Sequence, residues 1–369
     1  GPGAVFWMWI SAFLGMCTKF SEVTLAVHFR ETNPDGDLAG GPMYYIKNGL
    51  GKKWQFLAVL FSVFGIFTVF GTGNATQVNT ITAAINSALL NYNLITEDST
   101  KMGNLIMGIV LALIVGMVLL GGIKRIGQVT EKLVPFMAVF YVICAIIALI
   151  INADKIPATF ALIFHEAFNF QAAAGGAAGY GIILAMRYGF ARGVFSNEAG
   201  LGSAPIAHAA SSTKEPVEQG IWGMFEVFFT TIIICTLTAL VILTSGVIDS
   251  TSLKGSALCI AAYNSVLPGV GAVCITLATV FFATSTTLGW AYYGEKAVEF
   301  LFHKSQKAVF VYRLIYIAFV FLGAVGNLDI IWNISDTMNG LMAIPNLIGI
   351  IGLSGIVVAA TKEYFAKEK

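Results

Sequence analysis

Charged and small residues occur together in residues 186–205, MRYGFARGVFSNEAGLGSAP, between two apolar stretches. This stretch carries Arg187, Arg192 and Glu198 together with four glycines. A charge at bilayer depth costs roughly 2.5–3.5 kcal/mol, so a helix that serves only as a spacer would not carry these residues. Glycines let a helix open, and open backbone is tolerated at that depth only where it lines a protein-enclosed cavity. The stretch therefore predicts a helix that is broken at residues 188–190 around a small solute.

The break and the charges have different predicted roles. Gly189 and Phe190 lie at the break and are candidates for contact with the solute. Backbone N–H groups of the second half-helix can hold an anionic group such as a carboxylate. Arg192 and Glu198 are six residues apart and do not share a helix face. Both follow the break on its cytoplasmic side, so they are candidates for an inner gate.

A second polar patch, FGTGNATQVNTI, occupies residues 70–81 in the middle of a long apolar segment. Gly73 and Gln77 are four residues apart and share a helix face. The amide of Gln77 offers two donors and an acceptor, which suits contact with a polar solute. Small and polar residues also hold membrane helices together, which is the alternative for the threonines and asparagines of the patch. Gln77 and Gly73 are therefore candidates for solute binding.

Four consecutive hydroxyl side chains occupy residues 284–287, and Trp290 follows them. Hydroxyls beside unwound carbonyls can hold Na⁺. At most two of the four can touch one ion, because consecutive residues of a helix point in different directions. The alternative is that each hydroxyl bonds to a carbonyl of its own helix. Trp290 is a candidate for lining a cavity, with a lipid-facing or core position as the alternative.

Asp336 stands at the outer end of the last apolar segment, in IWNISDTMNG. It is a candidate for an outer gate that closes by pairing with a polar group elsewhere. The alternative is a helix N-cap, where an aspartate stabilises a helix by about 1 kcal/mol without any role in function.

The elements that must position these residues are membrane helices. The chain has 369 residues, of which 57% are hydrophobic and 11% charged, whereas a soluble protein carries about 25% charged residues. Its mean hydropathy is +0.80. The five cysteines lie in or beside apolar segments without a CxxC pair, which indicates packing and not disulfides or metal ligands. The composition predicts an all-α polytopic membrane protein, and no basic cluster or aromatic pattern indicates nucleic-acid binding.

Nine segments are apolar over about 20 residues, the length that a spanning helix requires. They are approximately residues 4–28, 54–90, 104–122, 133–152, 177–209, 218–246, 266–302, 310–328 and 336–361. When the connecting segments are assigned alternately to the two sides, one side collects fourteen of the 21 basic residues and the other collects Lys101, Lys155 and Lys254. Because basic residues collect on the cytoplasmic side, we expect the C-terminus in the cytoplasm.

Two loops have structure of their own in this interpretation. Asn33-Pro34-Asp35-Gly36 predicts a turn. Residues 40–51, GGPMYYIKNGLG, are compatible with a short amphipathic helix that places Tyr44 and Tyr45 at the level of the lipid headgroups. Residues 160–170, FALIFHEAFNF, predict a similar helix on the other side.

Three motifs resemble those of a known family. Residues 1–15, GPGAVFWMWISAFLG, residues 40–46, GGPMYYI, and residues 191–210, ARGVFSNEAGLGSAPIAHAA, resemble the alanine or glycine:cation symporters, also called sodium:alanine symporters. The resemblance covers essentially the whole chain in a consistent order.

The resemblance implies a leucine-transporter-type fold with two inverted repeats of five helices, whose first helices are broken around the substrate. Residues 1–369 would be a single transporter domain, with 1–152 as the remainder of repeat one and 177–361 as repeat two. The broken first helix of repeat one would then be missing. We therefore expect transport from the intact protein and not from this stretch of chain alone.

The same resemblance implies roles for single residues. Thr286 and Thr287 would be hydroxyl ligands of Na⁺. Gln77 would face the substrate from the third helix of the fold. Gly189 and Phe190 would lie at the break of the sixth helix, with Phe190 as a lid, and Trp290 would shape the cavity.

The expected function is import of alanine or glycine with Na⁺, or with H⁺ in some members, across the plasma membrane of a prokaryote. Besides the lipid bilayer, no organic cofactor, nucleic acid or obligate protein partner is expected. The sequence has no zinc pattern, catalytic dyad or nucleotide loop that would support an enzyme. A channel or a non-transporting sensor is a further alternative, but no ring-forming polar helix supports a channel.

Overall fold

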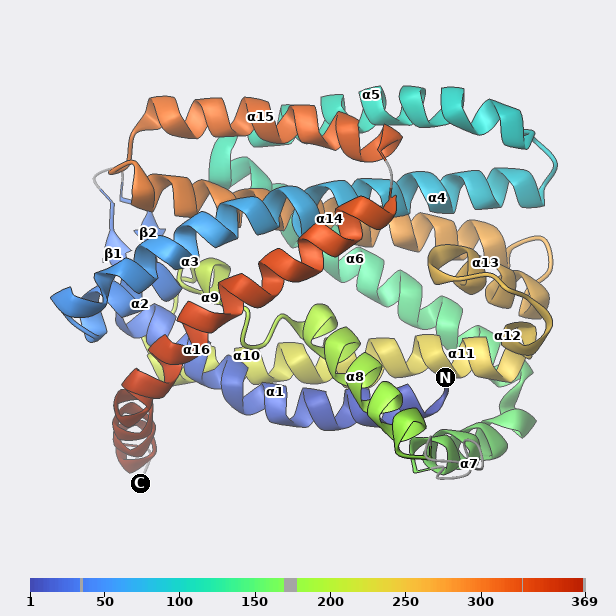
Figure 1. Cartoon of the computed structure of the whole chain (residues 1–369), viewed down its shortest axis with the longest axis horizontal. Coiled ribbons are helices and arrows are strands. Elements are labelled where there is room, and N and C mark those ends of the chain that lie inside the picture. Colours follow the sequence, from blue (N-terminus) through green and yellow to red (C-terminus); the bar gives the residue numbers. More distant parts are fainter. Residues whose placement is uncertain (34–35, 169–177, 327, 368–369) are drawn as a thin grey trace. The chain divides into compact units, whose positions relative to one another are not determined.

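The computed structural model describes residues 1–33, 36–168, 178–326 and 328–367. These residues are almost entirely helical (Figure 1). The predicted all-α class is confirmed. The strands in the described part of the chain form one small antiparallel pair, in which Glu31 lies opposite Ala39.

The first part of the chain ends in a very long helical segment. Its elements are α1 (Gly3–His28), β1 (Glu31–Thr32), β2 (Leu38–Ala39), α2 (Pro42–Gly49), η1 (Lys52–Trp54), α3 (Gln55–Thr68), η2 (Val69–Ala75) and α4 (Thr76–Asn91). The helix η2 has the wider π-helical winding and joins α3 to α4 without a gap.

The middle of the chain contains short helices between longer ones. Its elements are η3 (Glu97–Ser99), α5 (Thr100–Leu119), α6 (Gly122–Ile151), η4 (Ala153–Lys155), α7 (Ile156–Ala167), α8 (Ala178–Asn197), α9 (Ala204–His208), α10 (Pro216–Val227), η5 (Phe228–Cys235) and α11 (Thr236–Ser245). The last part consists of α12 (Val247–Ser250), α13 (Gly255–Val266), α14 (Gly271–Leu301), α15 (Gln306–Val325) and α16 (Leu328–Lys367).

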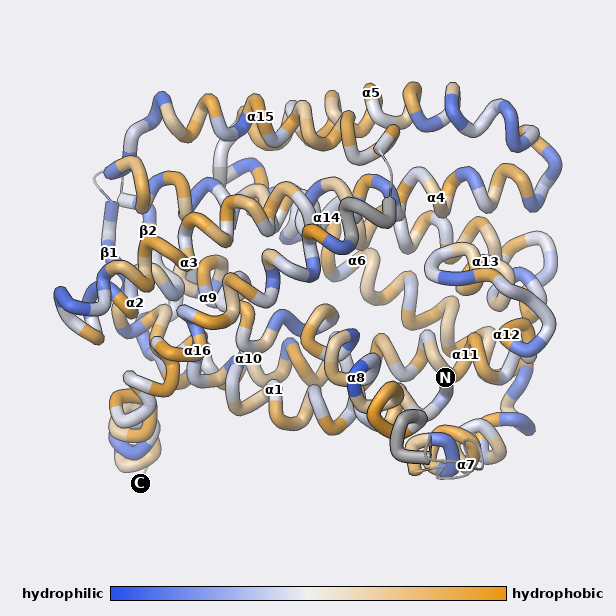
Figure 2. The backbone as a smooth tube through the Cα atoms, viewed as in Figure 1, coloured by the Kyte–Doolittle hydropathy of each residue, from blue (hydrophilic) through white to orange (hydrophobic). Residues whose placement is uncertain are grey.

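Eight helices of the described chain are long and apolar enough to cross a membrane. Hydrophobic residues dominate these helices, and hydrophilic ones gather at turns such as the one between α4 and α5 (Figure 2). Large apolar side chains of α5 are exposed, among them Ile106 at 54% and Leu113 at 62%. Lipid is the environment in which such a surface is stable. The chain is therefore a multi-pass membrane protein.

The predicted ninth span, residues 177–209, is not among these eight helices. Its place is taken by α8, which carries Arg187 and Arg192, and by the short α9. The count of nine is thus not confirmed.

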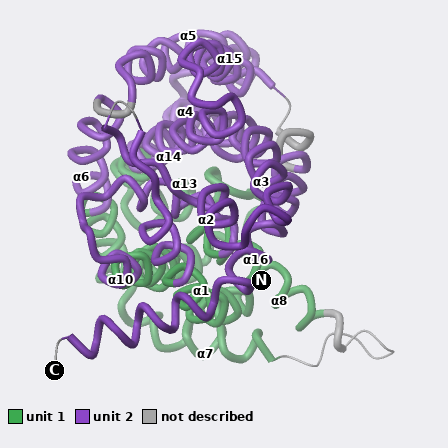
Figure 3. Tube along the Cα trace, turned by 90° about the vertical axis from the view of Figure 1, so that its left-hand side faces the viewer, with its two compact units in different colours: residues 1–20, 139–199, 221–275 green, residues 21–138, 200–220, 276–369 purple. Residues whose placement is uncertain are grey.

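The chain divides into two compact units (Figure 3). Unit 1 comprises residues 1–20, 139–199 and 221–275, and unit 2 comprises residues 21–138, 200–220 and 276–369. Within unit 1, α8 contacts η5 and α11 contacts α13. Within unit 2, α15 packs along α5, and α16 packs along α3 and η2. Each unit draws on both halves of the sequence.

The loop predictions are partly confirmed. The Gly36 N–H donates to the Asn33 carbonyl, as a turn requires, while residues 34 and 35 lie outside the described part. The short helix predicted near residues 40–51 is α2, but Tyr44 and Tyr45 do not lie on an outer face of it, because they are 2% and 0% exposed. The helix predicted at 160–170 falls within α7 as far as residue 167, and residues 169 and 170 are not described.

Candidate functional site

The bulge η2 is the feature around which polar groups of unit 2 gather. Its wider winding lets the Thr76 N–H reach back to the Gly71 carbonyl, and such bulges are frequent at functional sites. Side chains donate hydrogen bonds to two further carbonyls of the bulge, those of Thr72 and Gly73. The Thr72 carbonyl accepts from the Thr76 hydroxyl at 2.7 Å and from the Gln77 amide at 3.1 Å.

Gly73 lies directly against Trp290 of α14. A Cβ atom at Gly73 would lie 2.2 Å from the Trp290 Cβ, so only glycine permits this approach. Trp290 itself is 2% exposed. The structure thus brings together two residues that the sequence predicts for solute binding, and it assigns Trp290 to the interior and not to the lipid face.

Tyr316 of α15 connects the bulge to α14. Its hydroxyl lies 2.7 Å from the Thr287 carbonyl oxygen and 3.2 Å from the Gly73 carbonyl oxygen, so its single proton is shared between two acceptors. Asn74 donates in turn to the Tyr316 carbonyl at 2.9 Å. All these groups are buried. Sequence reasoning missed Tyr316, because its local signal is merely a hydroxyl in the middle of an apolar segment.

The hydroxyl run lies inside the continuous helix α14, without unwound carbonyls beside it. Thr286 donates to the Phe282 carbonyl and Thr287 donates to the Ala283 carbonyl, at 2.9 and 2.8 Å. These are the bonds that threonine makes to its own helix. Each oxygen has a proton directed to the helix and keeps lone pairs with which it can accept a hydrogen bond or a cation.

In unit 1 the predicted position of the helix break is wrong. Helix α8 runs without interruption through residues 188–190. Gly189 serves close packing against α1: a Cβ atom there would lie 2.5 Å from the Trp7 Cβ and 2.6 Å from the Ala4 carbonyl oxygen. Phe190 lies beside Trp7, with ring centroids 6.4 Å apart.

The break itself occupies residues 198–203, between α8 and α9. Glu198, Gly200 and Gly202 have φ angles of 57°, 86° and 83°, in the left-handed region where a helix cannot continue. The boundary between the two units falls within this break. The motif contained the signal for it, because GLG supplies the two glycines that tolerate such angles.

The gate candidates have different surroundings. Arg192 is exposed and lies over the Phe195 ring at 5.7 Å. Glu198 is the first residue of the break. Asp336 is exposed within α16, which begins at Leu328, so the N-cap interpretation of Asp336 is wrong.

A buried junction in unit 2 fixes the second half of the break. Asn346 of α16 donates to the Glu22 carboxylate and, at 2.9 Å, to the Gly200 carbonyl, and it accepts from the Tyr45 hydroxyl. Asn346, Glu22 and Tyr45 are all fully buried. Arg30 holds the following turn through the carbonyls of Ala209, Ser211 and Thr213.

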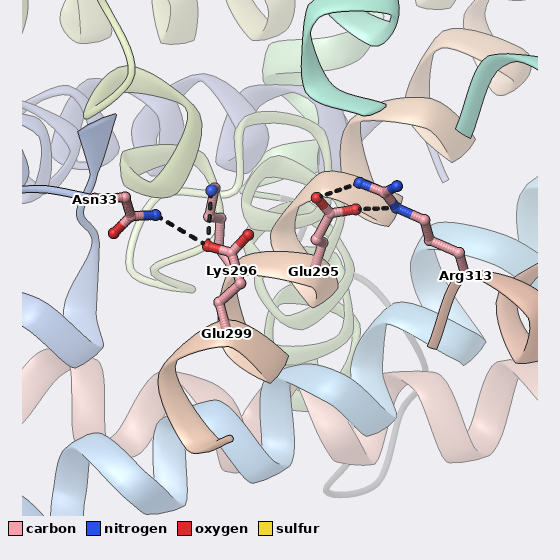
Figure 4. Close-up of polar contacts among 5 residues, drawn as sticks. All are labelled: Asn33, Glu295, Lys296, Glu299 and Arg313. Atoms are coloured by element: carbon pink, nitrogen blue, oxygen red, sulfur yellow. Dashed lines mark hydrogen bonds and ion pairs between the residues drawn. The ribbon is translucent and has the colours of Figure 1, made fainter. Parts of the chain in front are cut away.

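Two ion pairs lie near the C-terminal end of α14 (Figure 4). Arg313 of α15 holds Glu295 with two parallel bonds of 2.7 and 2.8 Å. Lys296 pairs with Glu299 at 2.8 Å, and Asn33 donates to the same carboxylate at 3.4 Å. The cluster ties the loop after α1 to α14 and α15. Lys296 and Glu299 are three residues apart on one helix, whereas Asn33 comes from 266 positions away, so the sequence could not reveal its contact.

A bulged helix and a broken helix lined with polar groups are typical of membrane transporters, in which interrupted helices surround the solute. The whole chain, residues 1–369, matches the sodium:alanine symporter family, and the chain belongs to that family.

The names of three relatives specify different substrates and ions. The chain is 45% identical to the sodium/alanine symporter AgcS of Methanococcus maripaludis, over 99% of the chain and 78% of that protein. It is 37% identical to the probable sodium/glutamine symporter GlnT of Bacillus subtilis, over 100% and 73%. It is 35% identical to the putative sodium/proton-dependent alanine carrier protein YrbD of the same organism, over 100% and 76%.

Proposed function

We propose that this chain forms the larger part of a symporter that imports a small neutral amino acid, alanine or glycine, together with Na⁺. The contact between Gly73 and Trp290 carries this proposal. In this proposal the close contact of the bulged backbone with the tryptophan restricts the site to a substrate with a small side chain. The relative AgcS, whose name specifies sodium and alanine, supports the same substrate class.

In this proposal the substrate lies beside η2 and α14, with Gly73, Gln77 and Trp290 around it. Thr286 and Thr287 offer their oxygen lone pairs to Na⁺. Na⁺ and substrate together favour one arrangement of the interrupted helices. One helix bundle then rocks against the other, as in transporters built from inverted repeats. Arg192, Glu198 and Asp336 act at the gates.

The inverted-repeat fold, with nine spans in this chain, also belongs to the proposal. The broken helix of 198–203 supports it, because it has the interrupted form that these folds place at the substrate. The C-terminus lies in the cytoplasm, as the distribution of basic residues indicates.

Uptake of labelled alanine and glycine by proteoliposomes of the full-length protein tests the function. We expect an inward Na⁺ gradient to drive accumulation, and a proton gradient in choline buffer to drive little. Uptake that neither gradient changes would contradict symport. The relative YrbD makes proton coupling the second candidate, and accumulation under the proton gradient alone would favour it.

Two variants test the site in the same assay. Thr287→Ala removes a hydroxyl oxygen, and we expect it to raise the Na⁺ concentration for half-maximal uptake while the substrate KM at saturating Na⁺ changes little. Gln77→Ala should raise the substrate KM. Losing one hydrogen bond to a charged group corresponds to about 1.5–3 kcal/mol, or roughly a tenfold change or more. Thr337→Ala removes an exposed hydroxyl of α16 and serves as the control. Wild-type kinetics in both site variants would refute the assignment.

A further inference from the structure

Two buried side-chain oxygens of α16 have no hydrogen-bond partner in the described part of the chain: Ser335 Oγ and Asn339 Oδ1. Ser335 is 0% and Asn339 8% exposed. The two residues are four positions apart and therefore lie on one face of the helix. A buried polar group without a partner costs about 1–3 kcal/mol, so two on one face indicate that something else binds there.

The bulge η2 forms the opposite wall. Ser335 Oγ lies against Gly71 so closely that a Cβ atom at Gly71 would be 2.3 Å from it. One residue on, Thr72 Oγ1 accepts from the Asn339 amide at 2.9 Å, and Thr72 is 4% exposed. Ser335 and Asn339 thus face the stretch of η2 that carries Gly71 and Thr72, and the missing side chain of Gly71 leaves room for the Ser335 hydroxyl.

The chemistry of these groups favours a hard monovalent cation. The groups are a hydroxyl, an amide carbonyl and a second hydroxyl, and oxygen is the ligand that such cations take. Among the residues that the structure describes, no group of three or more His, Cys, Asp or Glu could hold a metal ion. Neutral oxygens without carboxylates do not compensate a divalent charge, whereas they suit Na⁺.

We propose that Ser335, Asn339 and Thr72 form a Na⁺ site between α16 and η2. It is separate from the site proposed at Thr286 and Thr287, and it rests on the proposed Na⁺ symport. An ion there holds α16 against the bulge, and the Gly73 carbonyl of that bulge bonds to Tyr316 at the substrate side. Na⁺ binding thereby fixes the backbone that contacts the substrate.

Na⁺ binding to the purified full-length protein tests this site without transport. Thermal melting is followed during titration of NaCl at constant ionic strength with choline chloride, and ²²Na⁺ binding is measured in parallel. We expect Ser335→Ala and Asn339→Ala to weaken the apparent Na⁺ affinity about tenfold, which corresponds to about 1.4 kcal/mol. Gly71→Ala should do the same, because the added Cβ would displace the Ser335 hydroxyl.

Two further variants separate a lost ligand from a damaged fold. Asn339→Asp keeps an oxygen at the same place, and we expect it to retain or strengthen Na⁺ binding. Thr337→Ala lies on the same helix but is exposed, and it should bind Na⁺ as the wild type does. If the alanine variants at 335 and 339 bind Na⁺ with wild-type affinity and stoichiometry, the oxygens hold water and the proposal is overturned.

The outcome is independent of whether alanine is transported. Na⁺ binding that depends on Ser335 and Asn339 in a protein without Na⁺-driven uptake would support the site and refute the proposed function. Na⁺-driven uptake with unchanged Na⁺ binding in these variants would support the proposed function and refute the site.

Discussion

Tyr316 and Arg313 lie one helical turn apart on α15 and both bind α14, but through different chemistry. Tyr316 uses a neutral hydroxyl that is shared between carbonyls of Thr287 and Gly73. Arg313 uses a charge, and its partner Glu295 has a side chain only 5% exposed. Breaking either contact would leave buried polar groups without partners, and the cost is larger for the charged pair.

Removing the charge of Arg313 should destabilise the protein strongly. Arg313→Gln leaves Glu295 buried without its cation, at a cost of about 3–5 kcal/mol. The melting temperature of the purified protein measures the loss, and Arg313→Gln combined with Glu295→Gln should recover part of it. Lys367→Gln breaks an exposed pair with Glu363 and is the matched control. Equal melting temperatures for the Arg313 and Lys367 variants would contradict this prediction.

At the scale of elements, glycines have two distinct uses in this chain. Gly200 and Gly202 adopt left-handed backbone angles and end a helix. Gly189 stays inside α8 and lets it approach α1. The sequence alone does not separate these uses, because both appear as glycine among aromatic and charged residues.

Gly189→Ala should disturb the contact between α8 and α1. The added Cβ would meet the Ala4 carbonyl oxygen, which belongs to the backbone and cannot turn away. Overpacking of this kind costs about 1–3 kcal/mol. A lower melting temperature is expected, while Gly355→Ala should be neutral or stabilising, since open space surrounds Gly355 in α16. A Gly189→Ala variant as stable as Gly355→Ala would argue against close packing.

The contact between β1 and α2 should give a pH-dependent contribution to stability. Burial raises the pKa of Glu31, but hydrogen bonds from Lys47 and Asn48 and the Lys47 charge hold that pKa below its usual value. A lowered carboxyl pKa stabilises the fold above the ordinary pKa of about 4.3, and this contribution is lost as the pH falls through the folded-state pKa.

We therefore expect the wild type to have a higher melting temperature than Glu31→Gln at neutral pH, by no more than roughly 1 kcal/mol of stability because the pair is partly exposed. The two melting temperatures should converge as the pH falls through the lowered pKa of Glu31. Melting temperatures across this pH range measure the effect. A difference that grows on acidification would contradict it.

At the scale of the whole molecule, the eight apolar helices define a membrane protein, and the basic residues predict its orientation. Regular helices satisfy most of their backbone groups internally, as the bilayer demands, and side chains satisfy carbonyls of the bulge η2. The large apolar side chains exposed on α5 are stable only in lipid. Orientation is therefore a property of the loops and can be tested there.

Single cysteines introduced into a variant without the native five should report the two sides. Lys254→Cys should react with a membrane-impermeant maleimide added to intact cells, because its loop is predicted to lie outside. Lys362→Cys should react only after the cells are opened. Both residues are exposed in the structure. Labelling of Lys362→Cys in intact cells would reverse the predicted orientation.

The sequence by itself determined that the chain lies in a membrane and to which family it belongs. Hydropathy is a sum over neighbouring residues, and the family motifs are continuous stretches, so neither requires knowledge of the fold. It also singled out Gly73 and Trp290, which lie against each other in the structure, while their role at a substrate stays a prediction.

Only the tertiary structure decided which residues meet. The bulge at 69–75 arises where side chains of Thr76, Gln77 and Tyr316 satisfy backbone carbonyls, and Tyr316 comes from more than 200 positions away. The sequence pattern predicts that Tyr44 and Tyr45 lie at the membrane interface, whereas other parts of the chain bury them in the structure. The break at 198–203 differs from the predicted one because packing against α1 holds residues 188–190 helical. Burial and backbone winding depend on neighbours in space, which a linear pattern does not contain.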